Sequence, residues 1–211
     1  MLSAPNIQET LQRLAAQRPI FHSEADFQHA LAWSVHQSDP NAVIRLEVPF
    51  RTDDYSEYLD LLIISGDQSF AVELKYKTRR VVHRHADEEF SLKQQGAQDL
   101  GRYDFLADVG RLERFIAAKR AASGCAILVT NDSSYWSAPA RPGTVDEKFR
   151  LNEGRVIHGS LAWLEHASAG TMRSREKPVT LTGHYAAAWK PYSFPCATPG
   201  GEFRFLAWHV Q

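Results

Sequence analysis

Two strand-like segments, the first of them nearly all apolar, are separated by a short turn and constrain the fold of this chain more than any other feature of its sequence. Residues 58–65 read YLDLLIIS and residues 69–77 read SFAVELKYK, with Gly66 and Asp67 between them. Residues 58–65 are nearly all apolar apart from Asp60, which is typical of a strand that is covered on both faces, and residues 69–77 read as the next strand. The glycine-containing turn predicts that the two strands pair as a β-hairpin. A buried hairpin of this kind indicates an α/β protein, in which helices cover the sheet.

Helix and strand signals on either side of the hairpin extend this prediction. Ser23 is a favourable N-cap residue, with carboxylates in the turn that follows it. Apolar periodicity predicts helices over 5–18, from Ser23 to Asp39 and over 94–122, and strands over 42–50 and 125–130. Later runs at 155–164, 178–190 and 202–210 read as short strands. We therefore expect an α/β core with an N-terminal helix over residues 1–136, and a β-rich extension over residues 137–211 packed on it.

The charge balance limits the classes of function. The chain of 211 residues has 24 Lys and Arg against 25 Asp and Glu, a formal net charge of −1. This balance excludes a protein that binds polyanions through its bulk charge, but it allows a local basic groove. The two cysteines, Cys125 and Cys196, exclude a disulfide framework and a four-cysteine zinc site. No apolar run is long enough to span a membrane, so we expect a soluble cytoplasmic protein.

Polar residues within the hairpin carry the expected chemistry. Asp60 interrupts the first apolar strand, and Glu73 and Lys75 lie two residues apart on the second, where they share a face. Two carboxylates that converge on one face suit a hard divalent cation such as Mg²⁺, which polarises a phosphoryl oxygen and activates bound water. The alternative is a surface ion pair between Glu73 and Lys75 on an edge strand, with Asp60 at the entry of its strand.

This pattern resembles the PD-(D/E)XK nuclease superfamily, whose restriction-endonuclease-like fold is a mixed sheet flanked by helices. The resemblance covers roughly residues 20–130 and rests on Asp60, on Glu73 and Lys75 in the next strand, and on the order of the surrounding elements. Leu59 stands where the family has a proline that is often missing. The string from Glu73 to GAQDLGRYDFL also looks like an uncharacterised bacterial family placed in this superfamily.

The resemblance implies a role for each of these residues. Asp60 and Glu73 would bind Mg²⁺ or Mn²⁺, with the Leu74 carbonyl as a third ligand, and Lys75 would be the catalytic lysine. Glu24 matches a glutamate that many members place on the first core helix, near the metal. Many nucleases of this type cut as dimers, so the resemblance also implies that this chain can form a homodimer.

Basic and amide side chains indicate where nucleic acid would bind. Arg79, Arg80 and Arg84 belong to a run of cations that follows the second hairpin strand, and such a run can guide a phosphate backbone to the metal. Gln98 and Arg102 share a face of the long helix, and Arg102 is suited to hold phosphate through two parallel hydrogen bonds. A solvated charged hairpin and ordinary pairing on the helix surface are the alternatives for these two groups.

These residues together predict a metal-dependent nuclease that hydrolyses the phosphodiester bonds of nucleic acid, with DNA as the expected substrate. One alternative is a catalytically inactive module of the same fold that binds nucleic acid or a protein partner. Another is a structural protein whose β-rich tail is its binding surface.

Overall fold

The computed structural model describes residues 6–51 and 56–211 and has a mixed α/β architecture. Within these residues, six strands form one sheet in the order β1-β2-β3-β6-β10-β9. The strands are β1 (Val43–Arg51), β2 (Ser56–Ser65), β3 (Gln68–Lys77), β6 (Ser123–Thr130), β9 (Lys190–Ser193) and β10 (Phe203–Val210). β3 and β6 run parallel and the other neighbours run antiparallel. The expected α/β class is thus confirmed.

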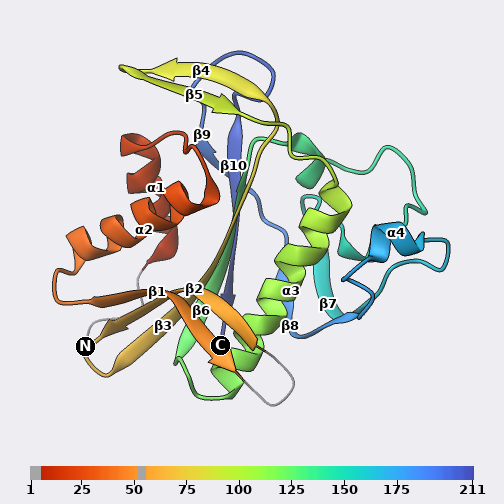
Figure 1. The fold of residues 1–211 in the computed structure, drawn as a ribbon, viewed down its shortest axis with the longest axis horizontal. Helices are drawn as coiled ribbons and strands as arrows, with labels where there is room; N and C mark the ends of the chain where they lie inside the picture. Colours follow the sequence, from red (N-terminus) through yellow and green to blue (C-terminus); the bar gives the residue numbers. More distant parts are fainter. Residues whose placement is uncertain (1–5, 52–55) are drawn as a thin grey trace.

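Helices cover both faces of the main sheet (Figure 1). They are α1 (Ile7–Gln17), α2 (Glu24–Ser38) and α3 (Gln98–Ala117), with a short α4 (Ala169–Met172) further along the chain. α1 and α2 share one core with Val72 and Leu74 of β3. α3 shares the other core with Ala71 on the opposite face of the same strand. Because successive side chains of a strand alternate between faces, Glu73 and Lys75 lie on the side of α3.

The predicted hairpin and N-cap are both present. β2 pairs antiparallel with β3, and the pairing ends with Leu61 opposite Val72. Ser23 Oγ accepts a hydrogen bond from the Asp26 backbone N–H at 3.1 Å, so α2 begins where the sequence predicted. The long helix is shorter than the predicted span of 94–122. Left-handed backbone conformations before and after it, with φ of 58° at Ala97 and 57° at Lys119, limit its length.

Residues 137–211 contribute to two sheets. β7 (Val156–Leu161) and β8 (Val179–Ala186) form a two-stranded ribbon whose apolar side chains join the core beneath α3. β10 pairs with β6, and β9 pairs with β10, so both strands belong to the main sheet. The sheet therefore continues across residue 136, and the sequence did not predict the short strand β9.

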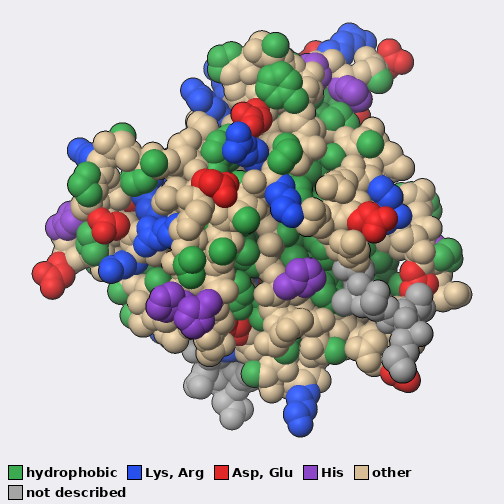
Figure 2. Space-filling view, turned by 180° about the vertical axis from the view of Figure 1, so that it is seen from behind, with side chains coloured by type: hydrophobic (Ala, Val, Ile, Leu, Met, Phe, Trp, Pro, Cys, Tyr) green, Lys and Arg blue, Asp and Glu red, His purple; other side chains and the backbone are tan. Residues whose placement is uncertain are grey.

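A second hairpin projects beyond the main sheet. It consists of β4 (Val81–His85) and β5 (Glu88–Leu92) and stands at the top of Figure 1. Short 3₁₀ helices, η1 (Ser133–Tyr135) and η2 (Glu147–Phe149), follow β6. On the face seen in Figure 2, Lys and Arg side chains are interspersed with Asp and Glu, as a formal net charge of −1 leads one to expect. None of the helices in the described part of the chain has the length and apolar character needed to cross a membrane.

Candidate active site

Strand β2, which carries Asp60, and strand β3, which carries Glu73 and Lys75, separate from each other near these residues. Pairing between β2 and β3 ends at Leu61 and Val72, whereas β2 stays paired with β1 as far as Ser56. At this fork, the Asp60 carboxylate accepts a hydrogen bond from the Leu74 backbone N–H at 2.6 Å. The carboxylate thus replaces a strand-to-strand contact and satisfies a backbone donor that the divergence leaves unpaired.

Glu24 makes the equivalent contact one step further along β3. Its carboxylate accepts a hydrogen bond from the Tyr76 backbone N–H at 2.7 Å. The Tyr76 hydroxyl donates to the Phe21 carbonyl at 3.1 Å, just before α2. Since Glu24 is the first residue of α2, these contacts fasten the start of that helix to the strand edge that Asp60 also binds.

Glu73 is buried beneath α3 with little to compensate its charge. Its side chain is 1% exposed, and Arg111 Nε lies 3.1 Å from Oε1. This contact is an ion pair without hydrogen-bond alignment, and neither carboxylate oxygen has a hydrogen-bond partner among the described residues. Burial, followed by the neighbouring Asp108 charge, raises the pKa of Glu73 well above its usual range, and Arg111 only partly opposes the shift. Glu73 therefore favours a bound proton or a bound cation.

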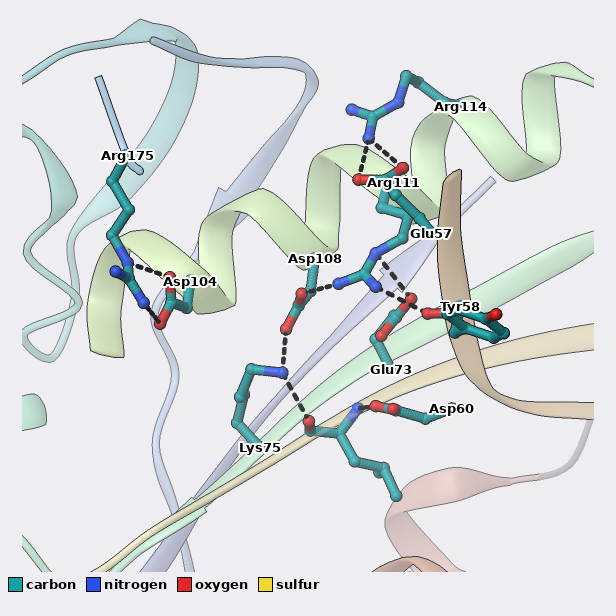
Figure 3. A network of polar contacts seen from close by, with 11 residues as sticks. Glu57, Tyr58, Asp60, Glu73, Lys75, Asp104, Asp108, Arg111, Arg114 and Arg175 are labelled. Atoms are coloured by element: carbon teal, nitrogen blue, oxygen red, sulfur yellow. Dashed lines mark hydrogen bonds and ion pairs between the residues drawn. The ribbon is translucent and has the colours of Figure 1, made fainter. Parts of the chain in front are cut away.

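Lys75 is held between β3 and α3 (Figure 3). Its ammonium Nζ lies 2.6 Å from Asp108 Oδ2 and donates to the Leu74 carbonyl at 3.2 Å. Burial lowers the pKa of Lys75, but the charges of Asp108 and Glu24 raise it by more, so the net shift is upward. Lys75 thus stays protonated, and it is suited to donate hydrogen bonds and to stabilise negative charge.

Helix α3 provides partners that the sequence had not revealed. Asp108 contacts both Lys75 and Arg111, and Arg111 also donates to the Tyr58 carbonyl at 2.7 Å. Arg111 thereby joins α3 to the part of β2 that has separated from β3. Asp104, Asp108 and Arg111 are spaced i, i+4 and i+7, so they share one face of the helix. The spacing of these three charged residues along one face of the helix is the sequence signal that could have identified Asp108 and Arg111 as partners of the site.

The ion pairs of Glu73 and Lys75 with residues of α3 exclude the alternative that these two residues simply pair with each other. β3 is an interior strand of the main sheet, between β2 and β6. Glu73 pairs with Arg111, and Lys75 pairs with Asp108. A surface ion pair between Glu73 and Lys75 on an edge strand therefore does not describe this site.

Gln28 of α2 positions the strand at Asp60. Its side-chain amide donates to the Asp60 backbone carbonyl at 2.9 Å and to the Glu47 carboxylate at 2.8 Å. Glu47 has a left-handed φ of 50°, and the β1–β2 pairing passes over Glu47 and Asp60. The Gln28 amide thus replaces a ladder contact at this point, and no pattern in the sequence distinguished it from other helix residues.

A cleft of about 450 Å³ opens beside the network of ion pairs formed by Glu73, Lys75, Asp108 and Arg111. Lys75, Asp108 and Arg111 line it together with Asp104 and Arg175. Arg175 belongs to the segment after α4 and donates two hydrogen bonds to Asp104, at 2.6 and 2.9 Å (Figure 3). Of the predicted site residues, Lys75 lines this cleft, whereas Asp60 and Glu73 are not among its lining residues.

Asp60, Glu73 and the Leu74 carbonyl are the candidate metal ligands. Among the described residues, no group of three or more His, Cys, Asp or Glu side chains is arranged to hold a metal ion, but the expected set has only two carboxylates. Burial raises the pKa of Asp60, although the hydrogen bond from Leu74 opposes the shift. Counting Asp108 and Glu24, four carboxylates face the two cations of α3 and β3. A divalent cation fits this excess negative charge and the Glu73 oxygens that lack hydrogen-bond donors.

The predicted basic residues of the second hairpin are accessible. Arg79, Arg80 and Arg84 are exposed, on β4 and the segment before it. Arg84 lies opposite Glu89 in the β4–β5 pairing. Figure 2 shows positive, negative and histidine side chains close together on the hairpin at its upper right. The hairpin is therefore charged without being a purely basic surface.

Gln98 and Arg102 make contacts within the protein. Gln98 donates to the Asp132 carboxylate at 2.9 Å. Arg102 is 3% exposed and donates to Asp146 at 2.6 Å and to the Ser134 carbonyl at 2.9 Å. This burial corrects the expectation that Arg102 holds phosphate. Its guanidinium instead ties α3 to the loop after β6.

The structure brings Glu24, Asp60, Glu73 and Lys75 together along one strand and its immediate neighbours. A comparison of the chain with protein family models, with characterised proteins and with solved structures finds no match. The inference of function therefore depends on the fold class and on the geometry of this site.

Proposed function

We propose that this chain is a Mg²⁺-dependent nuclease of restriction-endonuclease-like fold that hydrolyses phosphodiester bonds in DNA. The observation that carries the proposal is the fork between β2 and β3, where Asp60, Glu73 and Lys75 lie close together and Lys75 lines an open cleft. The order of elements around the fork supports it, because a capped helix precedes three antiparallel strands, and a long helix and a parallel strand follow them.

Asp60, Glu73 and the Leu74 carbonyl would hold the metal. Bound Mg²⁺ supplies polarisation of a phosphoryl oxygen and a more acidic water molecule. The chain keeps the ligands in place without it, since Asp60 is held through its carboxylate by Leu74 and through its carbonyl by Gln28. Glu73 lies one residue from Leu74 on the same strand, so both ligands move with β3.

Lys75 would position the attacking water. Its ammonium group remains protonated because Asp108 and Glu24 raise its pKa despite burial. It therefore donates a hydrogen bond to the water and stabilises negative charge on the phosphate, and a proton acceptor must come from elsewhere. Asp108, 2.6 Å from Nζ, holds the ammonium group at the edge of the cleft.

Cleavage assays with matched variants test the proposal. The purified protein is incubated with plasmid DNA, single-stranded DNA and RNA, in Mg²⁺, Mn²⁺ or EDTA. We expect metal-dependent cleavage of DNA, lost in Asp60→Asn and in Lys75→Met. Asp67→Asn and Lys93→Met make the same chemical changes at exposed positions and should retain activity. If Asp60→Asn were as active as Asp67→Asn, and Lys75→Met as active as Lys93→Met, the assignment would be contradicted.

The ion pairs of the network favour one alternative, an inactive module of the same fold that binds nucleic acid without cutting it. In that case Arg111 and Lys75 serve only to neutralise Glu73 and Asp108. Calorimetric titration with Mn²⁺ distinguishes the two functions. The nuclease takes up metal with a defined stoichiometry that Glu73→Ala abolishes, whereas the binding module shows no such uptake.

A further inference from the structure

Three cationic side chains from three different elements line the same cleft. Lys75 comes from β3, Arg111 from α3 and Arg175 from the segment that follows α4. The cleft has a volume of about 450 Å³, within the range of sites that hold small ligands. Lys75 and Arg111 belong to the network at the fork. Arg175 has no part in the chemistry proposed above, yet the fold brings it to the same cleft.

The backbone around Arg175 is anchored without the help of its side chain. The Trp163 indole N–H donates to the Arg175 carbonyl at 2.8 Å. The Tyr103 hydroxyl donates to the Lys177 carbonyl at 2.8 Å. Tyr103 and Trp163 are themselves buried and stacked, with 5.8 Å between ring centroids. The segment is therefore held from below by two rings, and the Arg175 guanidinium is not required to place it.

The Arg175 guanidinium is held by the Asp104 carboxylate, which another anion can replace. Arg175 Nε and Nη2 donate to the two Asp104 oxygens, and each of the two side chains is 29% exposed. A partly exposed pair is screened by water and contributes little to stability, so exchange of the carboxylate for another anion costs little. Two parallel N–H groups on one guanidinium match a phosphate group as well as they match a carboxylate.

We propose that Arg175, together with Lys75 and Arg111, forms a subsite in this cleft for a phosphate group of a nucleic-acid strand. The identity of this ligand rests on the proposed nuclease function. A strand bound in this way runs from the fork, past the acidic and basic face of α3, to the segment after α4. Arg175 is then a positioning residue, which holds the strand without contacting the phosphate that reacts.

Nucleic-acid binding in EDTA tests the subsite independently of cleavage. The probe is a fluorescein-labelled single-stranded DNA of about ten nucleotides, a length within the usual site sizes of proteins that bind single strands. Its binding is followed by fluorescence anisotropy over a range of salt concentrations. Arg175→Ala should weaken binding about tenfold and reduce the slope of log K against log salt by about 0.7, as expected for one lost phosphate contact to a single strand. Arg175→Lys should recover part of the affinity.

Arg173→Ala is the matched control. It removes the same charge two residues away, from an exposed side chain that does not line the cleft. We expect at most a twofold loss of affinity for this variant, and the urea midpoints of both variants should equal that of the wild type. Competition of inorganic phosphate with the probe should weaken in Arg175→Ala only. In cleavage assays, Arg175→Ala should raise KM and leave kcat unchanged.

The outcomes separate this inference from the nuclease proposal. Equal losses in Arg175→Ala and Arg173→Ala, or the absence of a loss in both, overturn the subsite even if the protein cuts DNA. A loss of binding confined to Arg175→Ala and partly restored by Arg175→Lys supports the subsite. If that loss is observed for a protein that does not cut DNA with Mg²⁺ or Mn²⁺, the subsite stands and the nuclease proposal fails.

Discussion

Loss of Lys75 should destabilise the fold more than loss of its partner Asp108, although each substitution breaks the same ion pair. Lys75→Met leaves the carboxylates of Asp60, Glu73 and Asp108 near one another, with Arg111 as the ion-pair partner of Glu73 and Asp108. Asp108→Asn instead leaves Lys75 and Arg111 facing Asp60, Glu73 and Glu24, so that the excess of carboxylates over cations falls by one. The two substitutions therefore change the charge of the buried network in opposite directions.

Burial of the pair sets the size of the effect. The side chains of Lys75 and Asp108 are 16% and 5% exposed, with 2.6 Å between Nζ and Oδ2. Removal of one member of a buried pair costs about 3–5 kcal/mol. The remaining contact of Asp108 with Arg111 places Lys75→Met at the lower end, about 3 kcal/mol. For Asp108→Asn, relief of the repulsion with Glu73 offsets the lost contacts and leaves a cost of about 1 kcal/mol.

Urea unfolding at neutral pH, followed by circular dichroism, measures both costs. With a slope of about 2 kcal/mol per molar urea, the midpoint should fall by about 1.5 M for Lys75→Met and by about 0.5 M for Asp108→Asn. Lys93→Met, at an exposed position, controls for the loss of a lysine. An Asp108→Asn cost equal to or larger than that of Lys75→Met would refute the view that the network has an excess of negative charge.

Three further predictions follow from buried polar contacts. Burial raises the pKa of Glu73 above its unfolded value of about 4.3, so the stability it contributes is present below that pH and is lost as the pH rises through the folded pKa. The free energy of unfolding of the wild type should therefore fall relative to that of Glu73→Gln as the pH rises above the unfolded pKa in urea titrations, and parallel curves would contradict this. Arg102→Met should cost about 3 kcal/mol in thermal unfolding, because Asp146 remains buried with only Arg150 at 3.1 Å as its ion-pair partner, and a cost typical of a surface residue would argue against it. Gln28→Ala should cost about 1 kcal/mol and weaken Mn²⁺ uptake in calorimetry, since it releases β2 at the fork, and unchanged uptake would show that the ligands are held by other contacts.

Local sequence patterns predicted most of the elements because those patterns record burial. In the hairpin over 58–77, Leu59, Leu61 and Ile63 of β2 are buried and Phe70 to Leu74 of β3 are buried on both faces, so apolar residues were frequent in both strands. Ser23 makes its capping bond within three residues, so its role was visible from sequence spacing alone. Contacts that depend on how distant elements pack were not visible. The pairing of Lys75 with Asp108 depends on how α3 lies over β3, and the pairing of β10 with β6 joins segments that are far apart along the chain.

The same limit applies to the charged residues. Arg102 has the chemistry of a phosphate-binding side chain, and only the fold of residues 131–150 around it shows that it is buried against Asp146. Gln28 resembles any polar residue of a helix until Glu47 adopts its left-handed conformation and leaves a gap in the strand pairing. Residue type thus identified the strands that carry the site, whereas the contact partners of the charged side chains could be identified only from the structure.

The position of β10 has a consequence for synthesis of the protein. β10 lies between β6 and β9, yet its residues 203–210 emerge from the ribosome long after β3 and β6. Until they emerge, the backbone of β6 that faces β10 lacks its strand partner, and apolar residues such as Val129 lack their neighbour in β10, Phe205. Such an open edge is prone to pair with other chains. The nascent chain is therefore expected to need protection at β6 until β10 has been added.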